Sequence, residues 1–133
     1  MLTTEDFKYI EDVIDEIKNK SKDLKRVYIS GPVSKYNDDV KACQIFNDCK
    51  QTLHERFNRY FTSIYIVNPI EINMNLPSYK QGKPLEWGDF MTVDLMLLSI
   101  CDNIYMLPNW PLSSGASCEY KFATINEIKE LKI

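Results

Sequence analysis

The chain has 133 residues, a formal net charge of −3, and ordinary hydrophobic and charged fractions of 44% and 26%. This length fits one domain with a modest core, and the composition is typical of a soluble globular protein. Lysines and arginines form no continuous run, which argues against long nucleic acid as a partner, whereas a small anion needs only a local site.

The cysteines indicate neither a metal site nor a disulfide framework. They form no CxxC motif, and the single histidine, His54, completes no zinc site of the usual spacing. We therefore expect no metal, no cofactor and four reduced, mostly buried thiols. The acidic N-terminus lacks the apolar core of a signal peptide and no apolar run could span a bilayer, so we expect a cytoplasmic location. The cysteines are Cys43, Cys49, Cys101 and Cys118.

Residues 1–25 predict an N-terminal helical extension. Apolar side chains recur there at helical spacing, and Thr3 or Thr4 is a suitable N-cap. Residues 26–30 then predict a short buried strand, which ends sharply at Gly31 and the proline after it.

The middle of the chain predicts a second helix, a second strand and a long loop. The helix is expected to start at Asp38 or Asp39, with an apolar inner face that continues to Phe57. Residues 64–67 predict the strand, which an Asn-Pro pair closes. Residues 70–84 predict a polar loop, and loops of that length are usually functional or mobile.

The last third predicts a helix over residues 85–100, a strand over residues 103–107 and a final helix over about residues 115–131. Alternating strands and helices predict a single α/β domain over residues 26–133, Rossmann-like or flavodoxin-like, with a parallel sheet flanked by helices. In such sheets ligands bind beyond the carboxyl ends of the strands. We therefore expect the site in the segments that follow the strands, including the loop at residues 108–114.

The helix predicted over residues 85–100 is apolar almost all round. A helix of that kind is covered on both sides, so we expect a homo-oligomer, dimer or larger, packed through it. Asp94 lies in the middle of an apolar stripe and must be paired, protonated or facing a pocket. A cap on a backbone group, or a Lys or Arg partner, is the structural alternative for Asp94. Asp102 is expected only to mark the turn from this helix into the next strand.

The stretch from Ser113 to Glu119 carries the strongest chemical signal. Ser113, Ser114 and Gly115 form a turn that opens a helix, and free backbone N–H groups there bind anions. Glu119 lies one turn further on, where the positive helix end is expected to keep it ionised as a nucleophile or base. Gly31, between a strand and a helix, allows the backbone to approach a ligand closely. GxGxxG and Walker motifs are absent from the sequence.

Four segments together resemble the nucleoside 2-deoxyribosyltransferase superfamily, and within it the small phage and bacterial domains of unknown function. The resemblance spans about residues 26–125 and implies that Glu119 attacks the anomeric carbon of a 2-deoxyribosyl group. Asp94 is then implied to contact and protonate the departing base. One ionised carboxylate and one proton donor are what a retaining displacement requires. The resembling segments are residues 28–32, Asp94-Leu95, residues 101–110 and residues 113–119.

The resemblance also implies a substrate. The superfamily's nucleoside transferases tend to carry an acid six residues before the glutamate, and its nucleotide N-glycosidases a serine, as at Ser113 here. The expected substrate is therefore a nucleoside 5′-monophosphate. The phosphate-binding arginine of some relatives has no evident equivalent, and Lys35 is the candidate substitute. Some relatives also borrow a polar residue from a neighbouring subunit. The expected substrate-binding residues are Tyr28, Ser30, Gly31, Ser113, Ser114 and Gly115.

The sequence is compatible with several functions. The leading one is an N-glycosidase that releases a free base and a sugar 5-phosphate, in the cytoplasm of the host if the gene is phage-borne. The alternatives are a transferase that exchanges bases, a non-catalytic protein that binds nucleotides, and a structural module. Trp87 and Trp110 either stack on the base or belong to the core or an interface.

Overall fold

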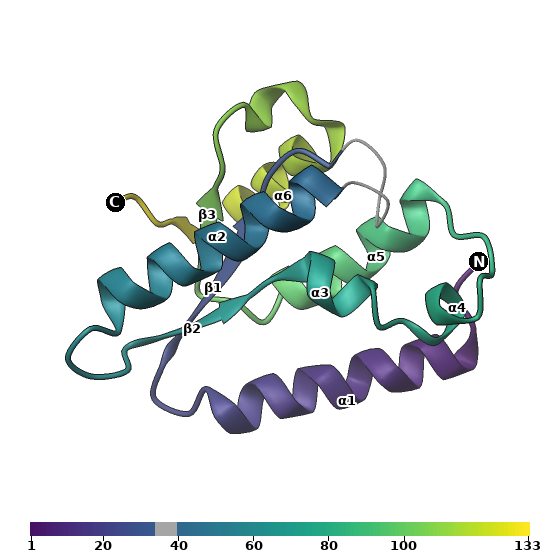
Figure 1. The fold of residues 1–133 in the computed structure, drawn as a ribbon, viewed down its shortest axis with the longest axis horizontal. Coiled ribbons are helices and arrows are strands. Elements are labelled where there is room, and N and C mark those ends of the chain that lie inside the picture. Colours follow the sequence, from purple (N-terminus) through teal and green to yellow (C-terminus); the bar gives the residue numbers. More distant parts are fainter. Residues whose placement is uncertain (34–39) are drawn as a thin grey trace.

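The structure, a computed structural model, describes residues 1–33 and 40–133 (Figure 1). Their strands form a four-stranded sheet in the order β2-β1-β3-β4, with every neighbouring pair parallel. This confirms the predicted α/β fold with helices on both faces of a parallel, Rossmann-like sheet. The elements in chain order are α1 (Thr4–Lys20), β1 (Lys25–Ser30), α2 (Val40–Phe57), β2 (Ile64–Val67), α3 (Pro69–Asn73), α4 (Pro77–Lys80), α5 (Trp87–Leu98), β3 (Asn103–Met106), the 3-10 helix η1 (Trp110–Leu112), α6 (Ser114–Ile125) and β4 (Lys129–Glu130).

The side chains of β1 alternate between the two faces of the sheet. Val27 and Ile29 join the buried cluster that contains Phe46 of α2, whereas Tyr28 joins the cluster formed with α1 and α5. Because successive strand residues point to opposite faces, Ser30 shares the face of Tyr28. Figure 1 shows α2 and α1 on opposite sides of the strands, in agreement with these two clusters. One strand therefore directs two hydroxyl groups to the face that α5 and α6 cover.

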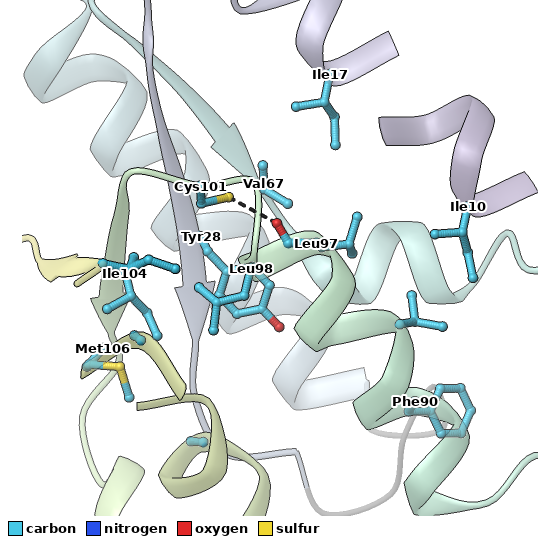
Figure 2. Packing of buried hydrophobic residues seen from close by; sticks show 14 of the residues in the cluster. Ile10, Ile17, Tyr28, Val67, Phe90, Leu97, Leu98, Cys101, Ile104 and Met106 are labelled. Atoms are coloured by element: carbon cyan, nitrogen blue, oxygen red, sulfur yellow. Dashed lines mark hydrogen bonds between the residues drawn. The ribbon is translucent and has the colours of Figure 1, made fainter. Parts of the chain in front are cut away.

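The N-terminal helix α1 belongs to the same core as the rest of the chain. Its residues Ile10 and Ile17 are 0% and 4% exposed, and in Figure 2 they point from α1 toward the cluster around Leu97. Thr3 is its N-cap and forms a capping box with Asp6, as the threonine at the predicted start suggested. The segment described from sequence as an extension is thus packed into the domain.

The chain between β2 and α5 differs from the predicted loop, because it contains two short helices. Asn68 caps α3 by accepting from the N–H of Ile70 at 3.1 Å, and a proline occupies the first position of both α3 and α4. Proline suits the first turn of a helix, where no N–H is required. The polar composition of residues 70–84 predicted a loop, whereas the Asn68 cap and the two prolines at helix starts favour helical turns.

The final helix is shorter than predicted. It ends at Ile125, and the left-handed φ of 58° at Glu127 turns the chain into β4, which pairs with β3. A strand of two residues is too short to show an alternating pattern, so the sequence did not predict it. The third helix likewise spans Trp87–Leu98, within the predicted residues 85–100. The predicted start of the second helix at Asp38 or Asp39 lies outside the described residues.

The chain itself covers much of α5. Phe90, Val93 and Leu97 are buried, with α3 and α6 packed against the helix, whereas Leu95 and Met96 are half-buried. The apolar composition of α5 therefore has an explanation within one chain. The homo-oligomer through residues 85–100 stays a prediction.

Asp102 has the structural role expected of it. Its Oδ2 accepts from the backbone N–H of Arg26 at 2.8 Å, while its own N–H donates to the Arg26 carbonyl at 2.9 Å. These bonds join the beginnings of β1 and β3. Within the described part of the chain, no helix is both long enough and apolar enough to cross a membrane.

Candidate functional site

A cavity of about 690 Å³ lies at the carboxyl ends of β1 and β3. These strands are neighbours, but the chain leaves β1 for β2 on one side of the pair and leaves β3 for β4 on the other. The cavity is therefore at the switch point of the sheet, where open α/β sheets bind their ligands. Its walls come from the segments after both strands and from the first turns of α2, α5 and α6. They include Val33, Lys41, Trp87, Leu107 and Asn109.

The turn before α6 forms one wall of this cavity, which Ser113, Ser114 and Gly115 all line. Ser113 is the N-cap, and its Oγ accepts from the N–H of Ala116 at 3.2 Å. Because the first N–H groups of a helix have no acceptors within it, this wall presents donors and the positive helix end. The Ser113 hydroxyl also keeps its own proton for donation to a ligand.

Two buried carboxyls lie one helical turn below this wall. Glu119 follows Gly115 by four residues on α6 and is 4% exposed, while Asp94 on α5 is 0% exposed. A hydrogen bond joins the two carboxyls. Neither of them is among the residues that line the cavity, so the acid pair lies beneath its floor.

The floor between the cavity and the acid pair is formed where α5 and α6 meet. A Cβ added at Gly115 would lie 3.4 Å from the Sδ of Met91 and 3.8 Å from the Nε1 of Trp87. Along α5, Trp87 lines the cavity, Met91 is one turn below it, and Asp94 follows three residues later. Met91 separates the cavity from the acid pair. Its thioether side chain is unbranched and flexible, so a change of its rotamer can connect the two.

Neutral donors hold both carboxyls in place. The Tyr28 hydroxyl donates to Glu119 Oε2, and the Ser30 hydroxyl donates to Glu119 Oε1 at 2.6 Å. On the other side of the pair, Asn73 Nδ2 donates to Asp94 Oδ1 at 2.8 Å. The structure thus brings together Tyr28, Ser30, Asp94 and Glu119, which were selected from the sequence, and adds Asn73 to them.

Each of the two carboxyls opposes the ionisation of the other. Burial and the neighbouring Asp94 carboxyl raise the pKa of Glu119 well above its ordinary value, although the hydrogen bonds from Ser30 and Tyr28 act in the opposite direction. The helix end therefore does not dominate the pKa of Glu119. Glu119 is the sixth residue of α6, and the field of a helix end fades beyond the first turn. Two carboxyls in contact share one proton, and they titrate as a pair.

Gly31 has a structural explanation. A Cβ added there would lie 2.7 Å from Cδ1 and 2.8 Å from Cβ of Leu107, which is closer than real Cβ atoms come to other atoms. The glycine lets the segment after β1 pack against the segment after β3. The expected approach of a ligand to this backbone is not required to explain the residue.

The site also contains three polar residues that the sequence did not predict: Asn73, Lys41 and Asn109. Asn73 lies in the segment predicted to be a loop, although a buried Asp94 had to have a partner somewhere. Lys41 on α2 lines the cavity and is exposed, whereas the expected cation, Lys35, lies outside the described residues. Asn109 lines the cavity with a left-handed φ of 67°, a conformation that asparagine tolerates, and the Pro-Asn pair at the end of β3 signalled such a turn.

The two tryptophans take different places. Trp87 lines the cavity and is 54% exposed, so its ring is open to a ligand. Trp110 stacks on Tyr120 with the ring centroids 4.5 Å apart, which gives it a partner within the chain. The described residues contain no group of three or more His, Cys, Asp or Glu side chains arranged to hold a metal ion, and the four cysteines are free thiols.

Comparisons with known proteins identify a family but no activity. No curated protein and no solved structure matches the chain significantly. One family model, described as "Domain of unknown function (DUF4406)", matches residues 25–130, from the first residue of β1 to the last of β4. This match contains the cavity and the acid pair and leaves α1 outside it. Because it covers most of the chain, the protein belongs to the DUF4406 family.

Proposed function

We propose that the chain is an N-glycosidase that cleaves the bond between base and sugar in a nucleoside 5′-monophosphate. The observation that carries the proposal is the buried pair of Glu119 and Asp94, which lies one helical turn below an anion-binding wall at the switch point of the sheet. A retaining glycoside displacement needs one carboxylate as nucleophile and one carboxylic acid as proton donor. Two carboxyls that share a single proton have that composition.

The reaction follows from this composition. Glu119 attacks C1′ of the sugar, and the bond from C1′ to the base nitrogen breaks with its electron pair on the base. The shared proton passes from Asp94 to the base, which leaves. Water then attacks C1′ of the glycosyl-enzyme, its proton returns to Asp94, and a sugar 5-phosphate departs from the restored Glu119 carboxylate.

The walls of the cavity favour a phosphorylated substrate. Ser113, Ser114 and Gly115 present hydroxyl and N–H donors, and Lys41, which also lines the cavity, adds a cation. An acid at the place of Ser113 would repel a phosphate, whereas a hydroxyl donates to it. The apolar walls at Val33 and Leu107, with the exposed ring of Trp87, suit a nucleobase.

The test is base release. The purified chain is incubated with a panel of deoxynucleoside 5′-monophosphates and with the matching nucleosides, and free base is separated by chromatography. We expect hydrolysis of the monophosphates and little reaction of the nucleosides. Glu119→Gln should lower the rate by about a thousandfold or more, as removal of a nucleophile does. Glu11→Gln, the same change at an exposed glutamate of α1, should have no effect.

Faster exchange of bases between nucleosides than hydrolysis of monophosphates would contradict the proposal and favour a 2-deoxyribosyltransferase. In that reaction a second base takes the place of water at the glycosyl-enzyme. Adding a free base to the incubation and searching for a new nucleoside distinguishes the two.

A non-catalytic nucleotide-binding protein is the second candidate. The observation that favours it is that Glu119 is 4% exposed and that both of its oxygens accept hydrogen bonds from hydroxyls. For catalysis, a substrate would have to displace these neutral donors, whereas a protein that only binds nucleotides can keep them. A rise in melting temperature with nucleoside monophosphates, equal in wild type and Glu119→Gln and without base release, would favour this candidate. A cytoplasmic location and a homo-oligomer through residues 85–100 remain parts of the proposal.

A further inference from the structure

We propose that Asn73 is a positioning residue for the acid pair: it fixes Asp94 so that the shared proton lies on the oxygen that faces Glu119 and the leaving base. This inference rests on the proposed function. It concerns a residue in a segment that the sequence predicts to be a loop. It assigns the proton to one atom of Asp94.

Asn73 contacts the acid pair directly, through Asp94. Asn73 Nδ2 donates to Asp94 Oδ1 at 2.8 Å, and both side chains are 0% exposed. Asp94 Oδ1 accepts this N–H, and an oxygen that already accepts a hydrogen bond is the less favourable one to protonate. The contact therefore favours a proton on Asp94 Oδ2 or on Glu119. Both oxygens of Glu119 already accept from Tyr28 and Ser30, which favours Asp94 Oδ2.

Asn73 also lowers the stability of the fold, because one of its polar atoms is unpaired within the described part of the chain. Its Oδ1 is buried and has no hydrogen-bond partner among the described residues. Buried amide oxygens are nearly always paired, because an unpaired one has lost its hydration without compensation. A leucine of similar volume would avoid this loss. A residue of this type next to two buried carboxyls is explained by what its N–H group does for Asp94.

Hydrogen bonds with α1 hold the segment that carries Asn73. It is the last residue of α3, and the residue before it accepts a hydrogen bond from α1, where the Tyr9 hydroxyl donates to the Ile72 carbonyl at 2.9 Å. A few residues later, the N–H and hydroxyl of Ser78 donate to Asp6 of α1 at 2.9 and 2.5 Å. Helix α1, outside the family match, therefore secures the segment that carries Asn73.

The groups that face the pair decide the expected pH dependence. Tyr28 and Ser30 approach from β1, Asn73 from α3, and the two carboxyls from α5 and α6. Among these described groups Tyr28 is the other titratable one, and its hydroxyl carries a proton because it donates to Glu119. An N–H donor stabilises the ionised form of the carboxyl that it contacts. Loss of the Asn73 amide therefore moves both limbs of the bell-shaped pH–rate profile to higher pH.

The test compares Asn73→Leu with Asn75→Leu. Asn75 lies two residues further on and is exposed, and its side chain donates to the Glu71 carbonyl, so Asn75→Leu makes the same chemical change away from the pair. We expect Asn73→Leu to lower kcat about 10- to 100-fold, the range for groups that orient a reactive side chain, with KM little changed and the profile moved to higher pH. Asn75→Leu should keep the wild-type profile. An unshifted profile in Asn73→Leu, or an equal effect of both variants, would overturn the inference.

A measurement on the wild type needs neither variant nor substrate. The side-chain amide signals of Asn73 in ¹⁵N-correlated NMR spectra should shift with pH in step with the carboxyl carbons of the acid pair. An Asn73 amide that ignores this titration refutes the positioning role even if Asn73→Leu fails to fold. The proposed function fails separately, through absence of base release by the wild type.

Discussion

The buried Glu119 carries a stability cost at neutral pH. Its pKa in the folded chain is raised by burial and by Asp94, above the ordinary value of 4.5 that it has when the chain unfolds. Between these two values the folded state binds a proton that the unfolded state has released. The contribution of Glu119 to stability is therefore complete below about pH 4.5 and decreases as pH rises through the folded pKa.

Glu119→Gln removes this dependence. The amide keeps the size of the side chain and has no proton to lose, so its free energy of unfolding should decrease less from acidic to neutral pH than that of the wild type. Denaturant unfolding at a series of pH values measures both curves. Parallel curves would show that the acid pair does not hold a proton in the folded state.

Gly31 tests the close packing between the ends of β1 and β3. A methyl group there meets Leu107 at 2.7 Å, so Gly31→Ala forces the two segments apart. We expect a loss of roughly 1–3 kcal/mol in the free energy of unfolding, the usual cost of overpacking. Gly88→Ala is the matched control, because a Cβ at Gly88 meets nothing within 4 Å. A control as unstable as Gly31→Ala would refute the steric explanation.

At the scale of elements, Asp6 joins α1 to α4. It accepts from Thr3 within α1 and from Ser78 across the interface, and it is 0% exposed. Burial raises its pKa, but the hydrogen bonds from Ser78 and Thr3 lower it more, so the pKa lies below the ordinary 3.8. Its stabilising contribution is therefore present above about pH 3.8 and is lost as pH falls through the lower, folded value.

Asp6→Ala should cost about 2–4 kcal/mol, because it removes a helix cap and leaves buried donors of Ser78 unpaired. Asp15→Ala, at an exposed position of the same helix, should cost little. Thermal or denaturant unfolding measures both. If the inference about Asn73 is correct, Asp6→Ala should also move the pH–rate profile at a temperature where the variant is folded.

The sequence predicted the elements whose patterns are long or strongly buried. The periodicity of α1, α2 and α5, and the short apolar strands before Gly31, Asn68 and Pro108, led to the correct fold class. A cavity lies at the edge of the sheet where the site was expected. The acid pair was found because Asp94 interrupts an apolar stripe and Glu119 follows a Ser/Gly turn. The elements that were not predicted are short: α3, α4 and the two residues of β4 carry no periodic signal.

The raised pKa of Glu119 was not predicted from the sequence, for a different reason. A sequence places a carboxylate on a helix, but only the tertiary structure brings a second carboxyl against it and removes water from both. The partners of such a pair, Tyr28 and Ser30 from one strand and Asn73 from a short helix, converge from segments far apart in the chain. The sequence indicated that Tyr28 and Ser30 lie on the same face of β1, because side chains alternate along a strand. It did not indicate that both hydroxyls contact Glu119.

At the scale of the whole molecule, subunit number is the open prediction. The face of α5 that the chain leaves uncovered carries Thr92 between the half-buried Leu95 and Met96. Isolated apolar residues on a surface are ordinary, but neighbouring ones on one helix face are typical of an interface.

Thr92→Arg should therefore convert a homo-oligomer into monomers, because it places an unpaired charge and a long side chain in the middle of that interface. Light scattering coupled to size exclusion gives the mass of each form. Thr62→Arg makes the same change at another exposed threonine, after α2, and should leave the mass unchanged. A wild type that elutes as a monomer would remove the interface and would also mean that one chain must supply every residue around the cavity. In that case the donors on the wall, Ser113, Ser114 and Lys41, would have to hold the phosphate without help from a neighbouring subunit.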